Sequence, residues 1–173
     1  CLYGLGADAL NPEAVQRIFE LKQRPVQNPI LVLIDELSQL EQLVKRIPAV
    51  ACDLIDHFWP GRITLIFEAG DKLPLNLTAG TGKIGIRMPG HAVARALVKA
   101  VQRPITGTSA NLSGKPGCFR IDDLAPQLAR DLDYILDAGA LKGGAGSTVV
   151  DVSADVVQVL REGEIKAQKL FAL

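Results

Sequence analysis

The chain has 173 residues, of which 48% are hydrophobic and 22% charged. This composition is typical of a globular protein, and the length most simply predicts one domain over residues 1–173. Its 19 Lys and Arg balance 19 Asp and Glu, so no overall field draws the chain to nucleic acid, and any nucleic-acid surface would have to be a local patch. No apolar run approaches the 18 or more residues of a membrane span, so no membrane partner is expected.

Hydrophobic periodicity and turn residues predict alternating strands and helices. In chain order we expect a strand ending within residues 1–6, a helix from 12 to 22–24, a strand over 30–34, helices over 36–45 and 49–58, strands over 63–67 and 83–88, a helix over 91–101, a strand that turns within 105–114, a helix over 122–130, and strands over 134–136, 148–152 and 156–160. Since the two kinds of element interleave without a linker, the sequence predicts a single α/β (α+β) domain with a twisted, mixed, open sheet flanked by helices.

The three cysteines, Cys1, Cys52 and Cys118, are odd in number and far apart. They form no CxxC or CxxxH pattern, which favours reduced thiols and a cytoplasmic location and predicts no metal site. The chain opens in mid-pattern with Cys-Leu-Tyr-Gly, and its only methionine is Met88. We therefore expect further residues upstream of Cys1.

Residues 105–114 form the most informative stretch, with five short polar side chains and two glycines. Buried hydroxyl and amide groups need hydrogen-bond partners, so an ordinary core strand is excluded. One interpretation is a strand end whose polar groups converge on a small anionic ligand. The other is a turn that closes on itself through its own side chains.

Several cations invite two interpretations each. Lys22 and Arg24 stand at a predicted helix end before Pro25, where they either complement the helix dipole in water or form a rigid site for phosphate or carboxylate. Arg87 alternates with apolar residues and is either on the solvated face of an edge strand or a fixed cation for a carboxylate. Arg161 is by default a lone surface cation.

Two glycine-rich segments could bind phosphate. Gly80-Thr81-Gly82-Lys83 lacks both the earlier Gly and the following Ser or Thr of a P-loop, so Lys83 is not a P-loop lysine. Residues 143–148 could form an anion nest or a flexible loop. His57 and His91 have no matching partners, so neither a metal hydrolase nor a Ser-His-Asp hydrolase is predicted. Dispersed cations and hydroxyls suit binding and alignment of anions, as in phosphoryl or adenylyl transfer.

Seven short motifs are spread over nearly the whole chain. They are Tyr3-Gly4-Leu5-Gly6, Leu21-Lys22-Gln23-Arg24-Pro25, Trp59-Pro60-Gly61, Ile86-Arg87-Met88-Pro89, Thr108-Ser109-Ala110-Asn111-Leu112-Ser113-Gly114, Ser147-Thr148-Val149-Val150-Asp151 and Leu160-Arg161-Glu162-Gly163. In these motifs and in their order the sequence resembles the YrdC/TsaC family of threonylcarbamoyl-AMP synthases.

The resemblance implies a twisted α/β fold with a concave cavity. It also implies an enzyme, a nucleotidyltransferase that makes threonylcarbamoyl-AMP and pyrophosphate from L-threonine, bicarbonate and ATP, with Mg²⁺ accompanying ATP. Proteins of the TsaD, TsaB and TsaE type would then transfer the threonylcarbamoyl group to adenosine in tRNA, and tRNA itself is a further partner to consider.

Site residues carry over motif by motif. Lys22, Arg24, Ser109 and Asn111 match the family's Lys-x-Arg and Ser-x-Asn pairs and would be catalytic. The resemblance further implies nucleotide contacts from Arg24, Asn28, Lys83, Asn111 and Arg161, and threonine contacts from Arg87, Ser109 and Ser147.

Three features depart from the family pattern. The family's Pro-Thr stretch would lie upstream of Cys1, Leu33 stands where some members carry His, and the chain ends at Leu173, which is consistent with the short form of the family. Two other functions stay open: a non-catalytic protein of this fold that binds tRNA or double-stranded RNA, and a carbamoyl-transfer relative.

Overall fold

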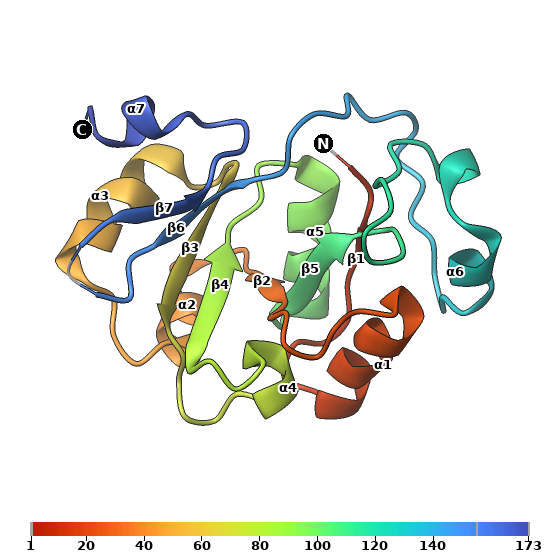
Figure 1. Cartoon of the computed structure of the whole chain (residues 1–173), viewed down its shortest axis with the longest axis horizontal. Coiled ribbons are helices and arrows are strands. Elements are labelled where there is room, and N and C mark those ends of the chain that lie inside the picture. The colour runs from red at the N-terminus through yellow and green to blue at the C-terminus, as the bar shows by residue number, and fades with distance from the viewer. Residues whose placement is uncertain (1, 155, 173) are drawn as a thin grey trace.

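The computed structural model describes residues 2–154 and 156–172. Its elements are β1 (Gly4–Leu5), α1 (Pro12–Lys22), β2 (Leu31–Leu33), α2 (Leu37–Leu43), α3 (Ala49–Phe58), β3 (Ile63–Glu68), α4 (Leu75–Thr78), β4 (Lys83–Arg87), α5 (Ala92–Val101), β5 (Ile105–Ser109), η1 (Ile121–Asp123), α6 (Pro126–Arg130), β6 (Thr148–Asp151), β7 (Gln158–Arg161) and α7 (Ala167–Leu170). Figure 1 shows their arrangement. Cys52 and Cys118 are free thiols, and Cys1 lies outside the described residues.

One seven-stranded sheet organises the domain, with strand order β1-β5-β2-β4-β3-β6-β7. The pairs β2–β4 and β3–β6 are parallel, and the other neighbours are antiparallel. The predicted mixed open sheet in an α/β domain is confirmed. The strand that carries Arg87, β4, lies in the middle of this order, so the interpretation of Arg87 as a residue on an edge strand is wrong.

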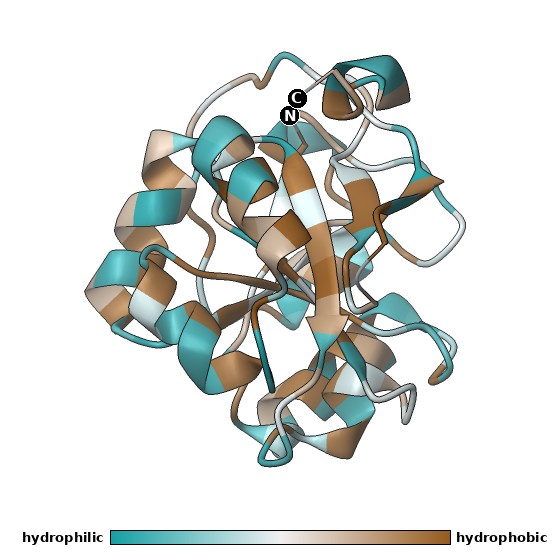
Figure 2. Cartoon of the chain, turned by 90° about the vertical axis from the view of Figure 1, so that its left-hand side faces the viewer, coloured by the Kyte–Doolittle hydropathy of each residue, from teal (hydrophilic) through white to brown (hydrophobic). Residues whose placement is uncertain are grey.

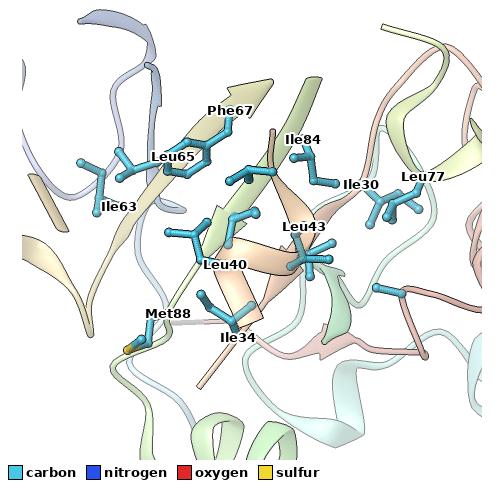
Figure 3. Close-up of a cluster of buried hydrophobic side chains, with 14 of the residues drawn as sticks. Ile30, Ile34, Leu40, Leu43, Ile63, Leu65, Phe67, Leu77, Ile84 and Met88 are labelled. Atoms are coloured by element: carbon cyan, nitrogen blue, oxygen red, sulfur yellow. The ribbon is translucent and has the colours of Figure 1, made fainter. Parts of the chain in front are cut away.

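The two faces of the sheet differ because side chains alternate along each strand. Ile63, Leu65 and Phe67 of β3 and Ile84 and Ile86 of β4 point to one face, where all five are fully buried. Helices α1, α2 and α3 contribute their apolar sides to the same core. Figure 3 shows Leu40 and Leu43 of α2 among these strand residues, and in Figure 2 the helices carry both teal and brown bands, as amphipathic helices do.

Helix α1 begins and ends where the sequence predicts. The Asn11 side chain accepts hydrogen bonds from the backbone N–H groups of Glu13 and Ala14, and Pro12 occupies the first turn. At the other end Gln23 adopts a left-handed conformation with φ of 50°. This turn leaves Lys22 inside the protein and directs the chain toward Arg24.

Three predicted elements differ in the structure. Pro126 disfavours a helical conformation at Ala125, so the helix predicted over 122–130 becomes the turn η1 followed by the short helix α6. Residues 134–136 do not form a strand, and Tyr134 is 90% exposed. They belong to a long loop between α6 and β6 that passes over the top of the molecule in Figure 1. The strand predicted over 156–160 lies at Gln158–Arg161.

Helix α5 has an apolar stripe that the core does not cover. Val98 is its buried residue, whereas Val93 and Val101 are each 42% exposed. Of the helices in residues 2–154 and 156–172, none is long and apolar enough to cross a membrane. Val93 lines the cavity described below, whereas Val101 is not among its lining residues.

Gly163 provides a test of how the end of β7 is held against the loop before β6. A Cβ atom at this position would overlap the carbonyl oxygen of Gly146 and lie 2.5 Å from the carbonyl carbon of Ser147. Overpacking of this kind costs about 1–3 kcal/mol, so Gly163→Ala should lower the free energy of unfolding by about 2 kcal/mol in urea titrations. The control is Gly90→Ala, because a Cβ there would meet its nearest atoms at 3.5 Å, and an equal loss in both variants would contradict this packing.

Candidate functional site

A cavity of about 710 Å³ opens on the sheet face that the helical core leaves uncovered. Its floor is formed by strands β2, β3, β4 and β5, and its rim by β1, α5, the loop before β6 and the end of β7. This volume is within the range of small-molecule sites. Of the site residues predicted from the sequence, Arg24, Arg87, Ser109, Ser147 and Arg161 line it.

Strand register explains how residues far apart in sequence meet here. Leu33 pairs with Ile105 on one side and with Arg87 on the other. Two strands further along, Val149 pairs with Arg161, and Thr64 of β3 joins the row by pairing with Val149. The resulting cross-strand row brings Arg87 on the floor and Arg161 on the rim to the same cavity, although 74 positions separate them in the chain.

Arg87 is a cation held in place without a carboxylate. Its Nε donates a hydrogen bond to the carbonyl oxygen of Gly61 at 2.8 Å. Burial lowers the pKa of the Arg87 guanidinium, and the nearby charge of Arg62 lowers it further. Arg62 is itself paired with Glu164. Arg87 therefore has a desolvated charge that a bound anion would stabilise.

Two further arginines line the cavity, and their side chains are likewise held by backbone carbonyl oxygens. Arg24 donates from Nε to the carbonyl oxygen of Asn28 at 3.0 Å and from Nη2 to that of Pro29 at 2.9 Å, and burial lowers its pKa. Arg161 donates from Nη2 to the carbonyl oxygen of Ser147 at 2.9 Å. Among the described residues, neither they nor Arg87 have an ion-pair partner. Three such cations around one cavity are chemically suited to binding anions.

At the polar end of β5, residues 105–114 fit both interpretations in part: one side chain faces the cavity, and others close the turn on itself. Ser109 faces the cavity, and its hydroxyl donates to Oδ1 of Asn111. The Asn111 amide in turn donates to the carbonyl oxygens of Leu112 and Lys115. Asn111 is not among the residues that line the cavity. It closes the turn on itself and so holds Ser109 at the floor.

Lys22 lies beneath this turn and is only 1% exposed. Its Nζ donates to the carbonyl oxygens of Ser109 at 2.5 Å and Asn111 at 2.6 Å, and to Oδ1 of Asn111 at 3.2 Å. All three donors of the ammonium group are thereby used. Burial, with a smaller contribution from Arg24, lowers the pKa of Lys22 to about 8. In this structure Lys22 contacts the turn and does not reach the cavity.

Two other predicted residues lie outside the cavity. Nζ of Lys83 forms an ion pair with Oδ2 of Asp151 at 2.7 Å. Burial acts to raise the pKa of Asp151, but the contacts from Lys83 and Ser153 together lower it. Asn28 is exposed and contributes its backbone carbonyl to the support of Arg24. Lys83 thus is not brought together with the other site residues, and Asn28 contacts one of them, Arg24, only through its backbone carbonyl oxygen.

Sequence reasoning predicted Ser147 but missed Thr64, the buried hydroxyl that is paired with it. Oγ1 of Thr64 and Oγ of Ser147 lie 2.7 Å apart, and both residues line the cavity. The signal was present, because Thr64 is the one polar residue in the apolar strand segment 63–67. Tyr3 was also missed as a tether, since its hydroxyl donates to Asp137 and Gly139 and accepts from the N–H of Ala138 in the loop at the rim.

The open sheet face carries buried hydroxyl groups and arginines that converge without ion-pair partners among the described residues. These features are typical of the class of α/β proteins that bind small anionic molecules above a sheet. The family model Sua5/YciO/YrdC, described as "Telomere recombination", matches residues 1–163. The chain belongs to this family.

Two curated relatives are named threonylcarbamoyl-AMP synthase. The protein from Bacillus subtilis is 41% identical over 173 residues, covering 99% of this chain and 50% of the relative. The protein from Pyrococcus abyssi is 38% identical over 169 residues, covering 98% of this chain and 50% of the relative. This chain therefore spans about half the length of these relatives.

A solved structure of P. abyssi Sua5 complexed with L-threonine superposes on this chain with a TM-score of 0.94. The sequence identity is 38%, and the alignment covers 99% of this chain and 50% of that one. The expected YrdC-like fold is confirmed by this agreement.

The buried ammonium of Lys22 predicts a pH effect on stability. Its pKa is about 8 in the folded protein and 10.5 in the unfolded chain, so between these values the unfolded chain binds more protons and stability rises with pH. Relative to Lys22→Met, the wild type should gain up to about 3 kcal/mol from pH 8 to pH 10.5. Urea unfolding of both proteins across this range measures the gain, and a constant difference would show that the ammonium is not desolvated.

Proposed function

We propose that this chain catalyses the formation of threonylcarbamoyl-AMP, pyrophosphate and water from L-threonine, bicarbonate and ATP. The observation that carries the proposal is the convergence of Arg24, Arg87 and Arg161, without ion-pair partners, on one cavity. A carboxylate and a polyphosphate bound side by side would use all three charges. The names of the relatives and the threonine complex of P. abyssi Sua5 support the choice of substrates.

In the proposed site each substrate meets a different part of the cavity. Arg87 binds the carboxylate of threonine, and Ser109 and Ser147 lie near its polar groups. Arg24 and Arg161 contact the phosphates of ATP. The cavity aligns the reactants, and its contribution in this proposal comes from positioning and charge stabilisation.

The chemistry then proceeds in two bond-forming steps. The threonine amine attacks the carbon of bicarbonate and, with loss of water, gives a carbamate. A carbamate oxygen attacks the α-phosphate of ATP, and the bond to the leaving pyrophosphate breaks. Arg24 and Arg161 offset the negative charge that develops on the departing phosphates.

The remaining predicted residues keep supporting roles in this proposal. Lys22 and Asn111 hold the turn that presents Ser109, and Asn28 holds Arg24 through its carbonyl oxygen. A nucleotide contact from Lys83 stays a prediction, and it would require Lys83 to leave Asp151.

The proposal includes Mg²⁺ bound to ATP. Mg²⁺ commonly binds through substrate phosphates and keeps several waters, so it needs few protein ligands. Within the described part of the chain, no group of three or more His, Cys, Asp and Glu residues could hold a metal ion. Transfer to tRNA by partners of the TsaD, TsaB and TsaE type, and a cytoplasmic location, complete the proposal.

The decisive experiment measures pyrophosphate release from ATP with threonine and bicarbonate supplied together or singly. A synthase requires both. An RNA-binding protein without activity would need neither and would instead retain tRNA or double-stranded RNA, and a carbamoyl-transfer relative would work with carbamoyl phosphate. Release that does not depend on threonine would overturn the proposal.

Replacing Arg24 tests the phosphate contact. Losing a charge-assisted hydrogen bond costs about 1.5–3 kcal/mol, so Arg24→Ala should lower kcat/KM for ATP roughly 10- to 100-fold. The matched control is Arg17→Ala on the same helix, because Arg17 is half exposed and pairs with Asp133 away from the cavity. Near-normal turnover of Arg24→Ala would mean that Arg24 only ends helix α1.

A further inference from the structure

The last two strands of the sheet contain an irregularity beside the rim of the cavity. On β6 the residues Val149 and Val150 are consecutive, but their partners on β7, Arg161 and Val159, are two positions apart. Leu160 is therefore an extra residue between these two pairs, and the irregularity is a β-bulge. It lies at one end of the strand order, where β7 follows β6 (Figure 1).

The bulge decides which face of the sheet carries Arg161. Paired residues on neighbouring strands share a face, and side chains alternate along each strand. Val159 packs against the core and its partner Val150 is buried in it, so a regular strand would place Arg161, two positions later, on the core face as well. The extra residue shifts the alternation by one. Arg161 therefore shares the cavity face with its partner Val149.

A buried hydroxyl group holds the turn that follows the bulge. Thr148 is 0% exposed. Its Oγ1 accepts hydrogen bonds from the backbone N–H groups of Gly163 at 2.9 Å and Ile165 at 3.1 Å, and it donates to the carbonyl oxygen of Ile165 at 2.5 Å. These three bonds use the full capacity of a hydroxyl group. Thr148 is not among the residues that line the cavity, so in this structure it acts on the chain and not on a ligand.

The guanidinium of Arg161 is held at a second point of β6. Its Nη2 donates to the carbonyl oxygen of Ser147 at 2.9 Å. Arg161 is an exposed residue, so core packing does not fix its direction, and polar contacts and strand register must do so. Three consecutive residues of β6 share this role: Ser147 holds the guanidinium, Thr148 the turn after it, and Val149 the backbone.

We propose that Thr148 is a positioning residue that directs Arg161 into the cavity by holding the β-bulge of β7, although Thr148 itself contacts no substrate. This inference rests on the proposed function, in which Arg161 contacts the phosphates of ATP, and deepens it. Without the bulge the guanidinium would be on the opposite face of the sheet. The phosphate contact therefore depends on the hydroxyl of Thr148 as well as on the arginine.

Thr148→Val keeps the shape of the side chain and removes the hydroxyl. A small misplacement of a binding group has a large effect on rate, so this variant should lower kcat/KM for ATP about 10-fold or more. The KM for threonine should not change, and Thr148→Ser, which keeps the hydroxyl, should restore activity. The matched control is Thr78→Val, because Thr78 is also buried and its hydroxyl bonds the carbonyl oxygen of Leu75 in helix α4, away from the cavity.

A double-mutant cycle separates positioning from a general loss of stability. Its readout is calorimetric binding of tripolyphosphate, at urea-free conditions in which each variant is shown to be folded. If Thr148 acts through Arg161, Thr148→Val should weaken binding in the wild type but change it by less than about twofold when Arg161→Ala is already present, since residues that act together are not additive. Equal effects in both backgrounds would overturn the inference.

Moving the arginine by one position tests the bulge itself, and this test does not require Thr148→Val to fold. The double variant Leu160→Arg/Arg161→Leu has the composition and charge of the wild type. Because position 160 is the extra residue of the bulge, the double variant should bind tripolyphosphate as weakly as Arg161→Leu alone, roughly 10- to 100-fold below the wild type. Binding at the wild-type level would show that position 160 reaches the cavity face, and would overturn the inference.

Pyrophosphate release, measured beside tripolyphosphate binding, separates this inference from the proposed function. A non-additive cycle in binding without any pyrophosphate release would overturn the function and support the inference. Threonine-dependent release with an unchanged kcat/KM for ATP in Thr148→Val would overturn the inference alone. Tripolyphosphate binding or release that Arg161→Ala does not weaken would also overturn it, because Arg161 would then have no anion to contact.

Discussion

The two-residue alternation of side chains in the central strands is the constraint on which the rest of the structure depends. Isoleucine, leucine and phenylalanine occupy one face and are covered by helices α1, α2 and α3. The other face carries Thr64, Gly85 and Arg87, which no apolar helix could cover without burying uncompensated polar groups. The core on one face and the cavity on the other therefore come from the same strands.

Positive charges near the cavity are held in three different ways. Lys22 uses all its donors on backbone and amide oxygens of one turn, and Arg62 is neutralised by Glu164. Arg24, Arg87 and Arg161 donate to carbonyl oxygens without meeting a carboxylate. Carbonyl contacts fix the direction of these guanidinium groups while leaving their charge available, and this preorganisation is what a site for anionic substrates needs.

The cavity combines rigid and irregular parts. Its floor belongs to paired strands, whereas its rim includes the long loop from α6 to β6, which Tyr3 holds through three hydrogen bonds to residues 137–139. Functional groups on strands are held more precisely than groups on loops.

The sequence by itself determined the class of fold, the capped start of α1 and most strands, because these follow from local periodicity and turn chemistry. It also identified the cations and hydroxyls, and through its motifs the family. Only the tertiary structure decided that Arg87 is on a central strand, that Lys83 is paired with Asp151, that Lys22 lies under the turn of Ser109, and that Thr64 meets Ser147. The reason is physical: which residues share a row of the sheet depends on strand order and register, and both are set by contacts between segments far apart in the chain.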